Sequence, residues 1–388
     1  MQSKVIIKRG EPSDKIAYQA IEKVFDEDVH GKTVLLKPNA ARIGPSKTGL
    51  CTNPEVIKGL IDFFHEKGAQ KVFVGDSPIF GVDQWEALLN SGIKEICEQN
   101  GAVCVNLDEY SYDKLEIPGG IILDNIKVTS FLREVDIIVS MPVMKTHFYT
   151  GATLSIKNMK GCLYKKEKSK LHRIFKEPPD ISKGLTLDYG LADMVSVLWP
   201  QYVIIDGTVC MEGFGPGVGT PKNMDLVLAS KNPLAADLVA ARLMGMGWDS
   251  IKHLNLILEN SNTKIKDIAV DPENYMEFSQ TFELPSKDKL QADYPNIMMV
   301  EKGTCSACTN TVLAFLKTHG HKFPQDYNFT LATGKDLTSD ELPPGEVFLV
   351  GSCAAHLKDK YPLCKGCPPV GSSILYLIRG EEDNEDED

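Results

Sequence analysis

Residues 32–39 read KTVLLKPN, a short apolar run that ends in polar residues. A helical pattern begins near Pro54, with Asn53 as its N-cap, and extends to about Lys67. The next apolar run, KVFVGDS, occupies residues 71–77. Short strands that alternate with longer helices are typical of a parallel α/β sheet, so we predict that architecture for the first part of the chain.

The same alternation continues to about residue 270. Continuous apolar runs, typical of strands covered on both faces, occur at 102–108 (AVCVNLD), 135–143 (VDIIVSMPV), 202–207 (YVIIDG) and 226–230 (LVLAS). We expect helices at 84–97, capped by Asp83, and at 233–244, and a hairpin that turns at PGG, residues 118–120. The sequence therefore predicts a main α/β domain over residues 1–270 with a mostly parallel sheet.

A second, smaller α/β domain is predicted over residues 296–380. Residues 271–295 are acidic, irregular and punctuated by proline, and we expect a linker there. Strand patterns at 296–303, 328–334 and 346–352 then alternate with helical patterns at 309–318 and 371–378. Seven of the last eight residues, 381–388, are acidic, so we expect a disordered tail.

The composition excludes several classes of protein. The 388 residues are 43% hydrophobic and 24% charged, which is ordinary globular usage. The net charge of -11 lies largely in the acidic tail, so the charge balance gives no sign of nucleic-acid binding. The N-terminal residues lack an apolar export signal, and no apolar run is long enough to span a membrane. We therefore expect a cytoplasmic protein with no membrane partner.

Ten cysteines in a chain without an export signal predict reduced thiols rather than a disulfide framework. Five of them share the C-terminal quarter. Cys305 and Cys308 follow the first predicted strand of the small domain, Cys353 follows a later one, and Cys367 precedes the last predicted helix. Because the carboxyl ends of parallel strands meet at one edge of a sheet, we expect these side chains to converge on a metal centre.

Four thiolates suit either a 4Fe-4S cluster or a structural zinc ion. The cluster is favoured because the cysteines come from separate elements, and because two prolines follow Cys367, as in ferredoxin-type runs. Cys353 ends a predicted strand, whereas Cys364 falls in an irregular loop. We therefore predict the ligands Cys305, Cys308, Cys353 and Cys367. Cys364 in place of Cys353, zinc, and thiols without a metal remain as alternatives.

A basic segment lies between residues 145 and 176, with nine Lys and Arg side chains against one acid. It begins at the end of the strand VDIIVSMPV, so Lys145 and His147 should project into the crevice at the strand ends. Lys157 and Asn158 follow on a short helix. Such a crevice suits an anionic small molecule, and we predict Lys145 and His147 as catalytic residues. An ordinary hydrogen-bonded histidine, and a solvated loop over 165–176, are the competing interpretations.

Other polar residues occupy ends of the same predicted strands. Lys37 and Asn39 end one strand and Asp76 ends the next. A glycine-rich segment at 204–221, IIDGTVCMEGFGPGVGTP, matches neither the P-loop nor the dinucleotide-binding pattern, but it could form a tight loop facing a ligand or a flexible connection. The predicted anion-binding residues are Lys37, Asn39, Lys157, Asn158, Asp206 and Glu212.

Five motifs, in this order, resemble the family called domain of unknown function 362. They are LLKPN (35–39), VGDSP (74–78), MPVMKTH (141–147), LSIKNMKG (154–161) and DGTVCMEGFGPGVGTP (206–221). The resemblance covers most of residues 30–250 and is most specific through MKTH and KNMKG. It implies an association with iron–sulfur clusters, which members commonly carry on an added ferredoxin module. Here CSAC, GSC and GCPP stand in place of a ferredoxin cysteine run.

These observations predict an iron–sulfur oxidoreductase of anaerobic metabolism. A C-terminal cluster would face an anionic substrate or cofactor held in an interdomain crevice, and an electron-donor protein would be a possible partner. One alternative is a non-enzymatic electron-transfer or binding protein with a structural zinc ion or cluster. Another is a dehydratase-like enzyme in which an iron with an open coordination position acts as a Lewis acid.

Overall fold

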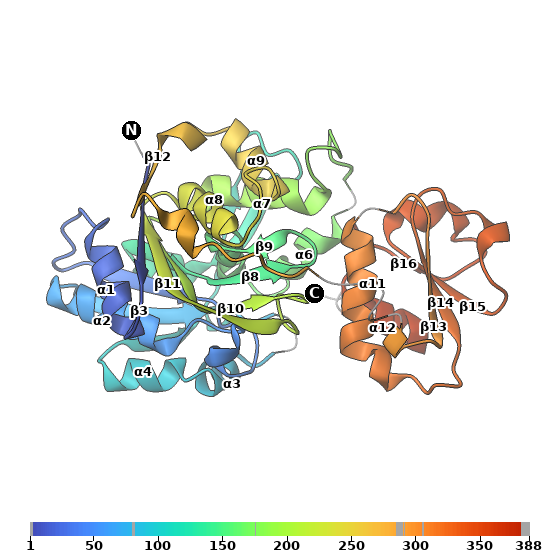
Figure 1. The fold of residues 1–388 in the computed structure, drawn as a ribbon, viewed down its shortest axis with the longest axis horizontal. Coiled ribbons are helices and arrows are strands. Elements are labelled where there is room, and N and C mark those ends of the chain that lie inside the picture. Colours follow the sequence, from blue (N-terminus) through green and yellow to red (C-terminus); the bar gives the residue numbers. More distant parts are fainter. Residues whose placement is uncertain are drawn as a thin grey trace.

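The computed structural model describes residues 3–79, 82–174, 176–284, 290, 292–304 and 306–381. Two α/β bodies lie side by side, the larger one formed by the blue to yellow part of the chain and the smaller by the orange to red part (Figure 1). Within the described ranges, no helix combines the length and the apolar character needed to cross a membrane.

The main domain is built on one large sheet. Its strands are ordered β12 (Ile268–Asp271), β1 (Ser3–Arg9), β11 (Thr220–Ser230), β10 (Tyr202–Glu212), β7 (Ile137–Met141), β2 (Thr33–Pro38), β3 (Lys71–Asp76) and β4 (Val103–Asn106). β11 runs antiparallel to both of its neighbours, whereas the other pairs along this path are parallel. The short strand β8 (Val143–His147) pairs with β10 and with β9 (Gly151–Thr153). The predicted α/β fold with a mostly parallel sheet is thereby confirmed.

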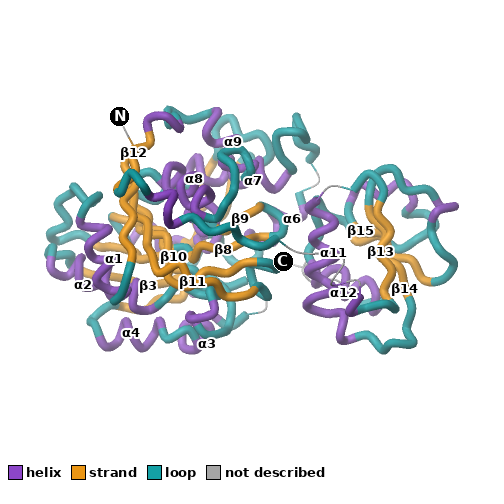
Figure 2. The backbone as a smooth tube through the Cα atoms, in the orientation of Figure 1, coloured by secondary structure: helices purple, strands orange, loops and turns teal. Residues whose placement is uncertain are grey.

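Helices cover both faces of this sheet (Figures 1 and 2). Side chains of β1 alternate between the two cores, since Ile6 packs with the helices of one face while Val5 and Ile7 pack with those of the other. The first face carries α1 (Ser13–Glu22), α2 (Pro54–Glu66), α3 (Gln84–Asn90) and α4 (Ile93–Gln99), and the second carries α5 (Ser155–Asn158), α7 (Thr186–Val197), α8 (Pro233–Leu243) and α9 (Lys252–Glu259). α6 (Glu167–Arg173) lies on the side of the small domain.

Local signals place several of these elements. The Asn53 side chain caps α2 by accepting a hydrogen bond from the Glu55 amide, and Asp83 caps α3 in the same way through Glu86. The helix expected at 84–97 is instead two helices, because Gly92 adopts a left-handed φ of 80° between them. The expected hairpin forms from β5 (Tyr112–Glu116) and β6 (Asn125–Thr129).

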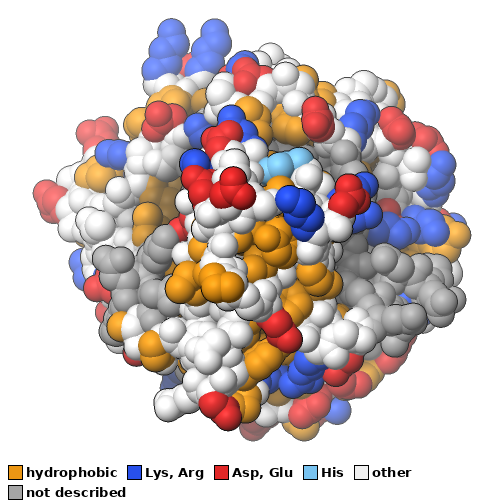
Figure 3. All heavy atoms as spheres, turned by 90° about the vertical axis from the view of Figure 1, so that its right-hand side faces the viewer, with side chains coloured by type: hydrophobic (Ala, Val, Ile, Leu, Met, Phe, Trp, Pro, Cys, Tyr) orange, Lys and Arg blue, Asp and Glu red, His pale blue; other side chains and the backbone are white. Residues whose placement is uncertain are grey.

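The small domain has a fully parallel sheet. Its order is β13 (Ile297–Glu301), β14 (Phe329–Thr333), β15 (Glu346–Val350) and β16 (Leu363–Cys364). α11 (Ser306–His319) and α12 (Gly371–Arg379) cover the face that looks toward the main domain (Figures 1 and 2). On the outer side, hydrophobic side chains gather near the middle, with charged side chains beside and around them (Figure 3).

The first half of the expected linker packs along the main domain. Phe282 is buried, and Tyr275 and Phe278 lie against the same core as α8. The amide of Phe282 donates to the Met244 carbonyl, and the Gly213 amide donates to the Glu283 carbonyl. Three aromatic side chains therefore fix a segment whose acidic and proline-rich composition suggested a linker. Residues 285–289 and 291, and the tail from 382 onward, lie outside the described residues.

Candidate functional site

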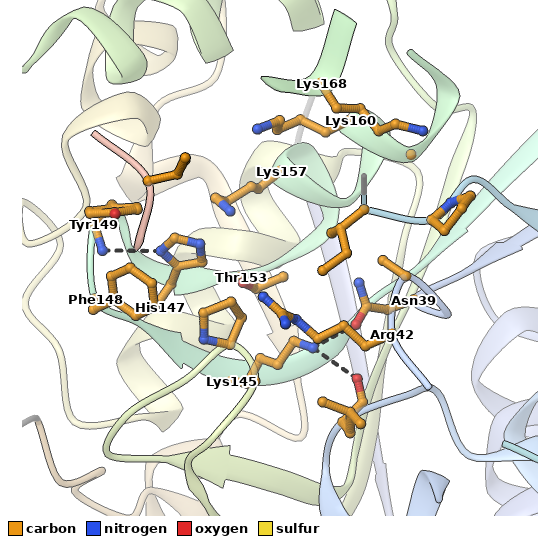
Figure 4. A pocket seen from close by; sticks show the side chains of 18 of the residues that line it. Asn39, Arg42, Lys145, His147, Phe148, Tyr149, Thr153, Lys157, Lys160 and Lys168 are labelled. Atoms are coloured by element: carbon orange, nitrogen blue, oxygen red, sulfur yellow. Dashed lines mark hydrogen bonds between the residues drawn. The ribbon is translucent and has the colours of Figure 1, made fainter. Parts of the chain in front are cut away.

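A cavity of about 480 Å³ lies between the two domains (Figure 4). On the main-domain side it is lined by residues at the carboxyl ends of β2, β3 and β8 and by residues of α5. On the other side it is lined by residues of α11 and the first turn of α12. The sites predicted at Lys37, Asn39, Lys145, His147, Lys157 and Asn158 all line this one cavity. Strand ends that are distant in sequence meet here because the sheet is parallel.

The cavity is strongly cationic. Six basic side chains line it: Lys37, Arg42, Lys145, Lys157, Lys160 and Lys168. Among the lining residues that the structure describes, Asp76 is the one acid. The local charge is therefore opposite in sign to that of the whole chain, and it favours an anionic ligand.

A buried ion pair forms the base of the cavity. Lys37 Nζ lies 2.6 Å from Asp76 Oδ1, and both side chains are 1% exposed. The same ammonium donates to Asn158 Oδ1 at 3.0 Å and to the Pro38 carbonyl at 3.0 Å. Gly161 closes over the pair, since a Cβ there would collide with both partners. Asp76 thus balances the charge of Lys37, and the hydrogen bonds hold its side chain in place. We infer that Lys37 shapes the site.

Lys145 has two hydrogen-bond acceptors but forms no ion pair with a carboxylate of any described residue. Its ammonium donates to Asn39 Oδ1 at 2.6 Å and to the Leu50 carbonyl at 2.9 Å (Figure 4). Burial lowers the pKa of Lys145 to about 8, and the nearby Arg42 contributes in the same direction. An anion in the cavity would stabilise the charged form of this side chain.

Three polar groups in the cavity lack a partner among the described residues. No hydrogen bond or ion pair to a described residue is found for the Lys157 ammonium or the Arg42 guanidinium. Thr153 Oγ1 is buried and likewise unpaired within the described part of the chain. Figure 4 shows these three side chains directed toward the same space. Buried polar groups are normally hydrogen-bonded, so the arrangement of these three groups favours a ligand with acceptor atoms.

Lys160 and Lys168 extend the cationic lining. Burial lowers the pKa of Lys160 to about 7, with Lys168 acting in the same direction. Lys168 Nζ lies 3.4 Å from Asp108 Oδ1 and also donates to the Ser77 hydroxyl. Burial lowers the pKa of Lys168 as well, despite that carboxylate. The segment 165–176, interpreted above as a solvated loop, therefore places one of its lysines in the cavity.

His147 is oriented by the backbone that follows it. Its Nδ1 accepts from the Tyr149 amide at 3.1 Å and from the Thr150 amide at 3.4 Å. A ring nitrogen that accepts two N–H groups carries no proton, so the proton of the neutral imidazole lies on Nε2. The ring is 6% exposed and lines the cavity, where it can give or take a proton.

Tyr149 joins the cavity to the small domain. Its hydroxyl donates to the Pro369 carbonyl at 2.6 Å, and Asn310 Nδ2 donates to the Phe148 carbonyl at 2.6 Å. Burial raises the pKa of Tyr149, and the thiols of Cys308 and Cys364 act in the same direction, which places both within electrostatic reach. The segment after His147 thus lies between the cavity and the cysteines.

Asp206 and Glu212 do not line the cavity. The Asp206 carboxylate is buried and accepts from the Asn53 amide at 2.7 Å and from Thr208, so it fixes the start of α2. Glu212 Oε2 lies 2.8 Å from Lys222 Nζ and accepts from the Glu283 amide, so it ties down the segment after β12. Of the glycine-rich segment, Pro216, Gly217 and Val218 line the cavity.

Parts of the described cysteine segments of the small domain lie beside Gly351, but no three His, Cys, Asp or Glu side chains among the described residues are grouped so that they could hold a metal ion. Cys308 Sγ would lie 2.7 Å from a Cβ on Gly351, and the Gly351 amide donates to the Cys364 carbonyl at 2.9 Å. The next amide, that of Ser352, donates to the Gly366 carbonyl, directly before Cys367. This edge also carries Thr333 Oγ1, a buried group without a partner among the described residues. Cys305 lies outside the described residues.

The reason for preferring Cys353 to Cys364 does not hold in the structure. Cys364 lies in strand β16, not in an irregular loop, and its side chain is buried. Cys353 lies in the 3-10 turn Ser352–Leu357 and is exposed. A two-residue edge strand has too little pattern for sequence reasoning to detect.

Sequence reasoning also missed Arg42, Thr153, Tyr149 and the wall that the small domain contributes. Arg42 follows the KPN motif by three residues, and Tyr149 follows His147 by two, so proximity to a motif was the available signal. His319, Phe315 and Ser372 line the cavity only because the two domains meet there. No local sequence pattern predicts such a contact between domains.

Two known proteins are similar to this chain, one in sequence and one in structure. A thylakoid-associated protein, sll1697, from Synechocystis sp. (strain ATCC 27184 / PCC 6803 / Kazusa) is 26% identical over 220 residues, which are 55% of this chain and 63% of that protein. The chain therefore spans less than two thirds of this relative. The lactate racemase apoprotein from Thermoanaerobacterium thermosaccharolyticum aligns with a TM-score of 0.44 at 11% identity, over 98% of this chain and 91% of the other.

The family assignment rests on a match that covers more than half of the chain. The model of the domain of unknown function DUF362 matches residues 34–242, which include the strand ends and α5 that line the cavity. The resemblance seen in the five motifs is thereby confirmed. This protein belongs to the DUF362 family.

Proposed function

We propose that this protein is an oxidoreductase that acts on an anionic small molecule in the interdomain cavity, with electrons supplied through a 4Fe-4S cluster on the small domain. The observation that carries the proposal is a set of three groups, Arg42, Thr153 and Lys157, that have no partner among the described residues and line a cavity walled by both domains. A carboxylate or phosphate there would accept from all three groups.

The lowered pKa values of the lysines in the cavity support the binding of an anion. Lys145 and Lys160 have lowered pKa values mainly because burial disfavours their charged forms. A bound anion would offset that desolvation and the mutual repulsion of the basic side chains. The binding energy would therefore come largely from charge-assisted hydrogen bonds.

The chemistry of the small-domain cysteines supports the cluster part of the proposal, because thiolates are the usual ligands of iron–sulfur clusters. Cys308, Cys364 and Cys367 come from separate elements that meet at Gly351, and a side chain at that position would collide with the Cys308 sulfur. Near Gly351, Thr333 offers a hydroxyl without a partner in the described part of the chain, and cluster sulfurs accept such hydrogen bonds. Cys305 with Cys308, Cys367 and either Cys364 or Cys353 would hold the group, and the burial of Cys364 favours it.

The chain's own residues have distinct parts in this proposal. Arg42 and Lys145 bind the anionic end of the substrate, and Thr153 orients it. His147 holds a proton at Nε2 and can donate a hydrogen bond from it to an oxygen of the substrate. Tyr149 and Phe148 fill the space between the cysteines and the cavity and exclude water from it. A bound cluster supplies one-electron transfer, with an electron-donor protein as the external source.

Metal analysis of protein purified without oxygen tests the cluster. Iron and acid-labile sulfide should be present in equal amounts, and zinc without iron or sulfide would support the structural-zinc alternative instead. Cys364→Ala and Cys353→Ala form a matched pair. We expect the first to lose most of the iron and the second to retain it, because Cys364 is the buried one. The reverse result would restore the ligand set predicted from the sequence.

Thermal unfolding with small anions tests the cavity. Sulfate, oxalate or phosphate should raise the melting temperature by mass action. Lys145→Ala should weaken the binding of the best anion about tenfold, since a charge-assisted hydrogen bond contributes about 1.5–3 kcal/mol. Lys183→Ala is the matched control, because Lys183 is exposed and pairs with Glu259 away from the cavity. Equal affinities in the two variants would contradict the site.

A further inference from the structure

Lys157 differs from Lys37, Lys145 and Lys168 in having no partner among the described residues. Lys37 pairs with Asp76, Lys145 donates to two oxygen acceptors, and Lys168 lies near Asp108. Lys157 makes no hydrogen bond or ion pair with any residue that the structure describes. Its amine is therefore available to a molecule that enters the cavity.

The backbone that carries Lys157 is firmly held. Asp237 Oδ1 accepts from the Ser155 amide at 2.8 Å and from the Ser155 hydroxyl at 2.5 Å, and Oδ2 accepts from the Ile156 amide at 3.0 Å. Both Ser155 and Asp237 are fully buried. This carboxylate fixes the first turn of α5, so the base of the Lys157 side chain is fixed relative to the cavity.

The surroundings of Lys157 favour the neutral amine. Burial lowers the pKa of Lys157 well below its usual range, and Lys160, Lys145 and Arg42 act in the same direction. A buried lysine next to other cations is the arrangement that makes an amine nucleophilic near neutral pH. Arg42 remains charged beside it and can hold a carboxylate.

We propose that Lys157 is a nucleophile that forms an imine with the carbonyl carbon of a 2-oxo acid bound in the cavity. This inference rests on the proposed function, because it requires that the cavity bind an anion, and it narrows the substrate class to an anion with a carbonyl group beside its carboxylate. Arg42 and Lys157 line the same cavity and lie within electrostatic reach of each other (Figure 4), so a carboxylate bound to Arg42 would bring the adjacent carbonyl carbon toward Lys157.

Imine formation between Lys157 and a 2-oxo acid requires no oxidant or reductant. The lone pair of Lys157 Nζ adds to the carbonyl carbon, and one of the two amine protons moves to the carbonyl oxygen, to which the N–H group at His147 Nε2 can donate a hydrogen bond. The second amine proton joins the hydroxyl group, which leaves as water. The product is a carbon–nitrogen double bond to Lys157, which addition of water reverses.

Reductive trapping tests the inference on the full chain. The protein is incubated near pH 7 with pyruvate or glyoxylate and sodium cyanoborohydride, and the adducts are mapped by peptide mass spectrometry. We expect a single adduct at Lys157 that forms about tenfold or more faster than adducts at exposed lysines, which are ammonium ions at this pH. Oxalate, an anion without a carbonyl group that can form an imine, should slow the labelling by competition.

Two variants control the labelling. Lys157→Arg keeps the positive charge but cannot form the imine, so it should lose the adduct and still be stabilised by oxalate. Lys160→Arg should keep the adduct at Lys157. Labelling of Lys157 no faster than of exposed lysines, with oxalate stabilisation intact, would overturn the imine while leaving the proposed function standing. A wild-type protein that no anion stabilises would contradict the proposed function itself.

Discussion

At the scale of single residues, the cavity concentrates positive charge where water is largely excluded. Lys145 has neutral acceptors, whereas Lys157 and Arg42 have no partner among the described residues. Like charges in a site of low dielectric constant disfavour one another's charged forms, so these side chains lose protons more readily than exposed ones. The same feature makes ligand binding depend on pH.

Anion binding should weaken as pH rises from about 7 to about 9. The pKa values of Lys160 and Lys145 in the folded protein are about 7 and about 8, below their ordinary value of 10.5. Above these values the amines are neutral and attract an anion less. The folded state of the ligand-free protein also binds fewer protons than the unfolded state between about 7 and 10.5, so its stability should rise with pH across that window.

Thermal unfolding at several pH values, with and without sulfate or oxalate, measures both trends. These two anions keep a constant charge over the range. The stabilisation by the anion should shrink with pH, and Lys160→Met should flatten its pH dependence. A stabilisation that stays constant from pH 6.5 to 9 would show that the titration of these lysines is not linked to binding.

At the scale of elements, short segments fix the functional side chains. α5 has only four residues, and its first turn is held by Asp237 through three hydrogen bonds. The side chains of Lys157 and Asn158 leave from this turn toward the cavity. A carboxylate buried outside the cavity therefore determines where two of its lining residues lie.

Asp237→Asn should both destabilise the protein and weaken anion binding. The amide can replace one acceptor oxygen but not both, which costs about 1–3 kcal/mol. Asp193→Asn is the matched control, because Asp193 accepts from the amides of Ile121, Ile122 and Leu123 near the β5–β6 hairpin. Denaturant unfolding should show similar losses in both variants, with weaker anion binding only in Asp237→Asn. Equal binding losses would indicate a general effect of lower stability.

The sequence predicted those parts of the site that lie at strand ends. Lys145 and His147 follow an apolar run directly, so the α/β pattern alone places them at the edge where the strands end. Asp206 also ends an apolar run, but β10 continues beyond it to Glu212, and its carboxylate turns to Asn53 instead. Thr153 and Arg42 could not be predicted, since their roles depend on which buried atoms are left without partners.

At the scale of the whole molecule, the two domains share the cavity. The small domain supplies His319 and the first turn of α12, whose amides have no acceptor within the helix. Tyr149 spans the contact, with its ring near His147 on one side and its hydroxyl on the Pro369 carbonyl, two residues after Cys367. The contact between the domains thereby brings the segment around Cys367 next to the cavity. Neither domain could form this cavity alone, because residues of both line it.

Tyr149→Phe should preserve the fold and shift the reduction potential of the proposed cluster. The variant removes one hydroxyl beside the cysteine edge and one hydrogen bond, which contributes about 1 kcal/mol to stability. Tyr189→Phe is the control, because the Tyr189 hydroxyl donates to the Asp180 carbonyl on the main domain. Redox titration should show a shift only for Tyr149→Phe. Identical reduction potentials in both variants would show that the Tyr149 hydroxyl does not influence the proposed metal centre.

The most direct test is the visible spectrum of the protein purified without oxygen, recorded before and after reduction and then with oxalate added. We predict a broad absorption that bleaches on reduction, and a reduction potential that oxalate shifts, because the anion cavity adjoins the cysteine edge. A colourless protein that contains zinc, or a cluster whose potential is the same with and without a bound anion, would contradict the account.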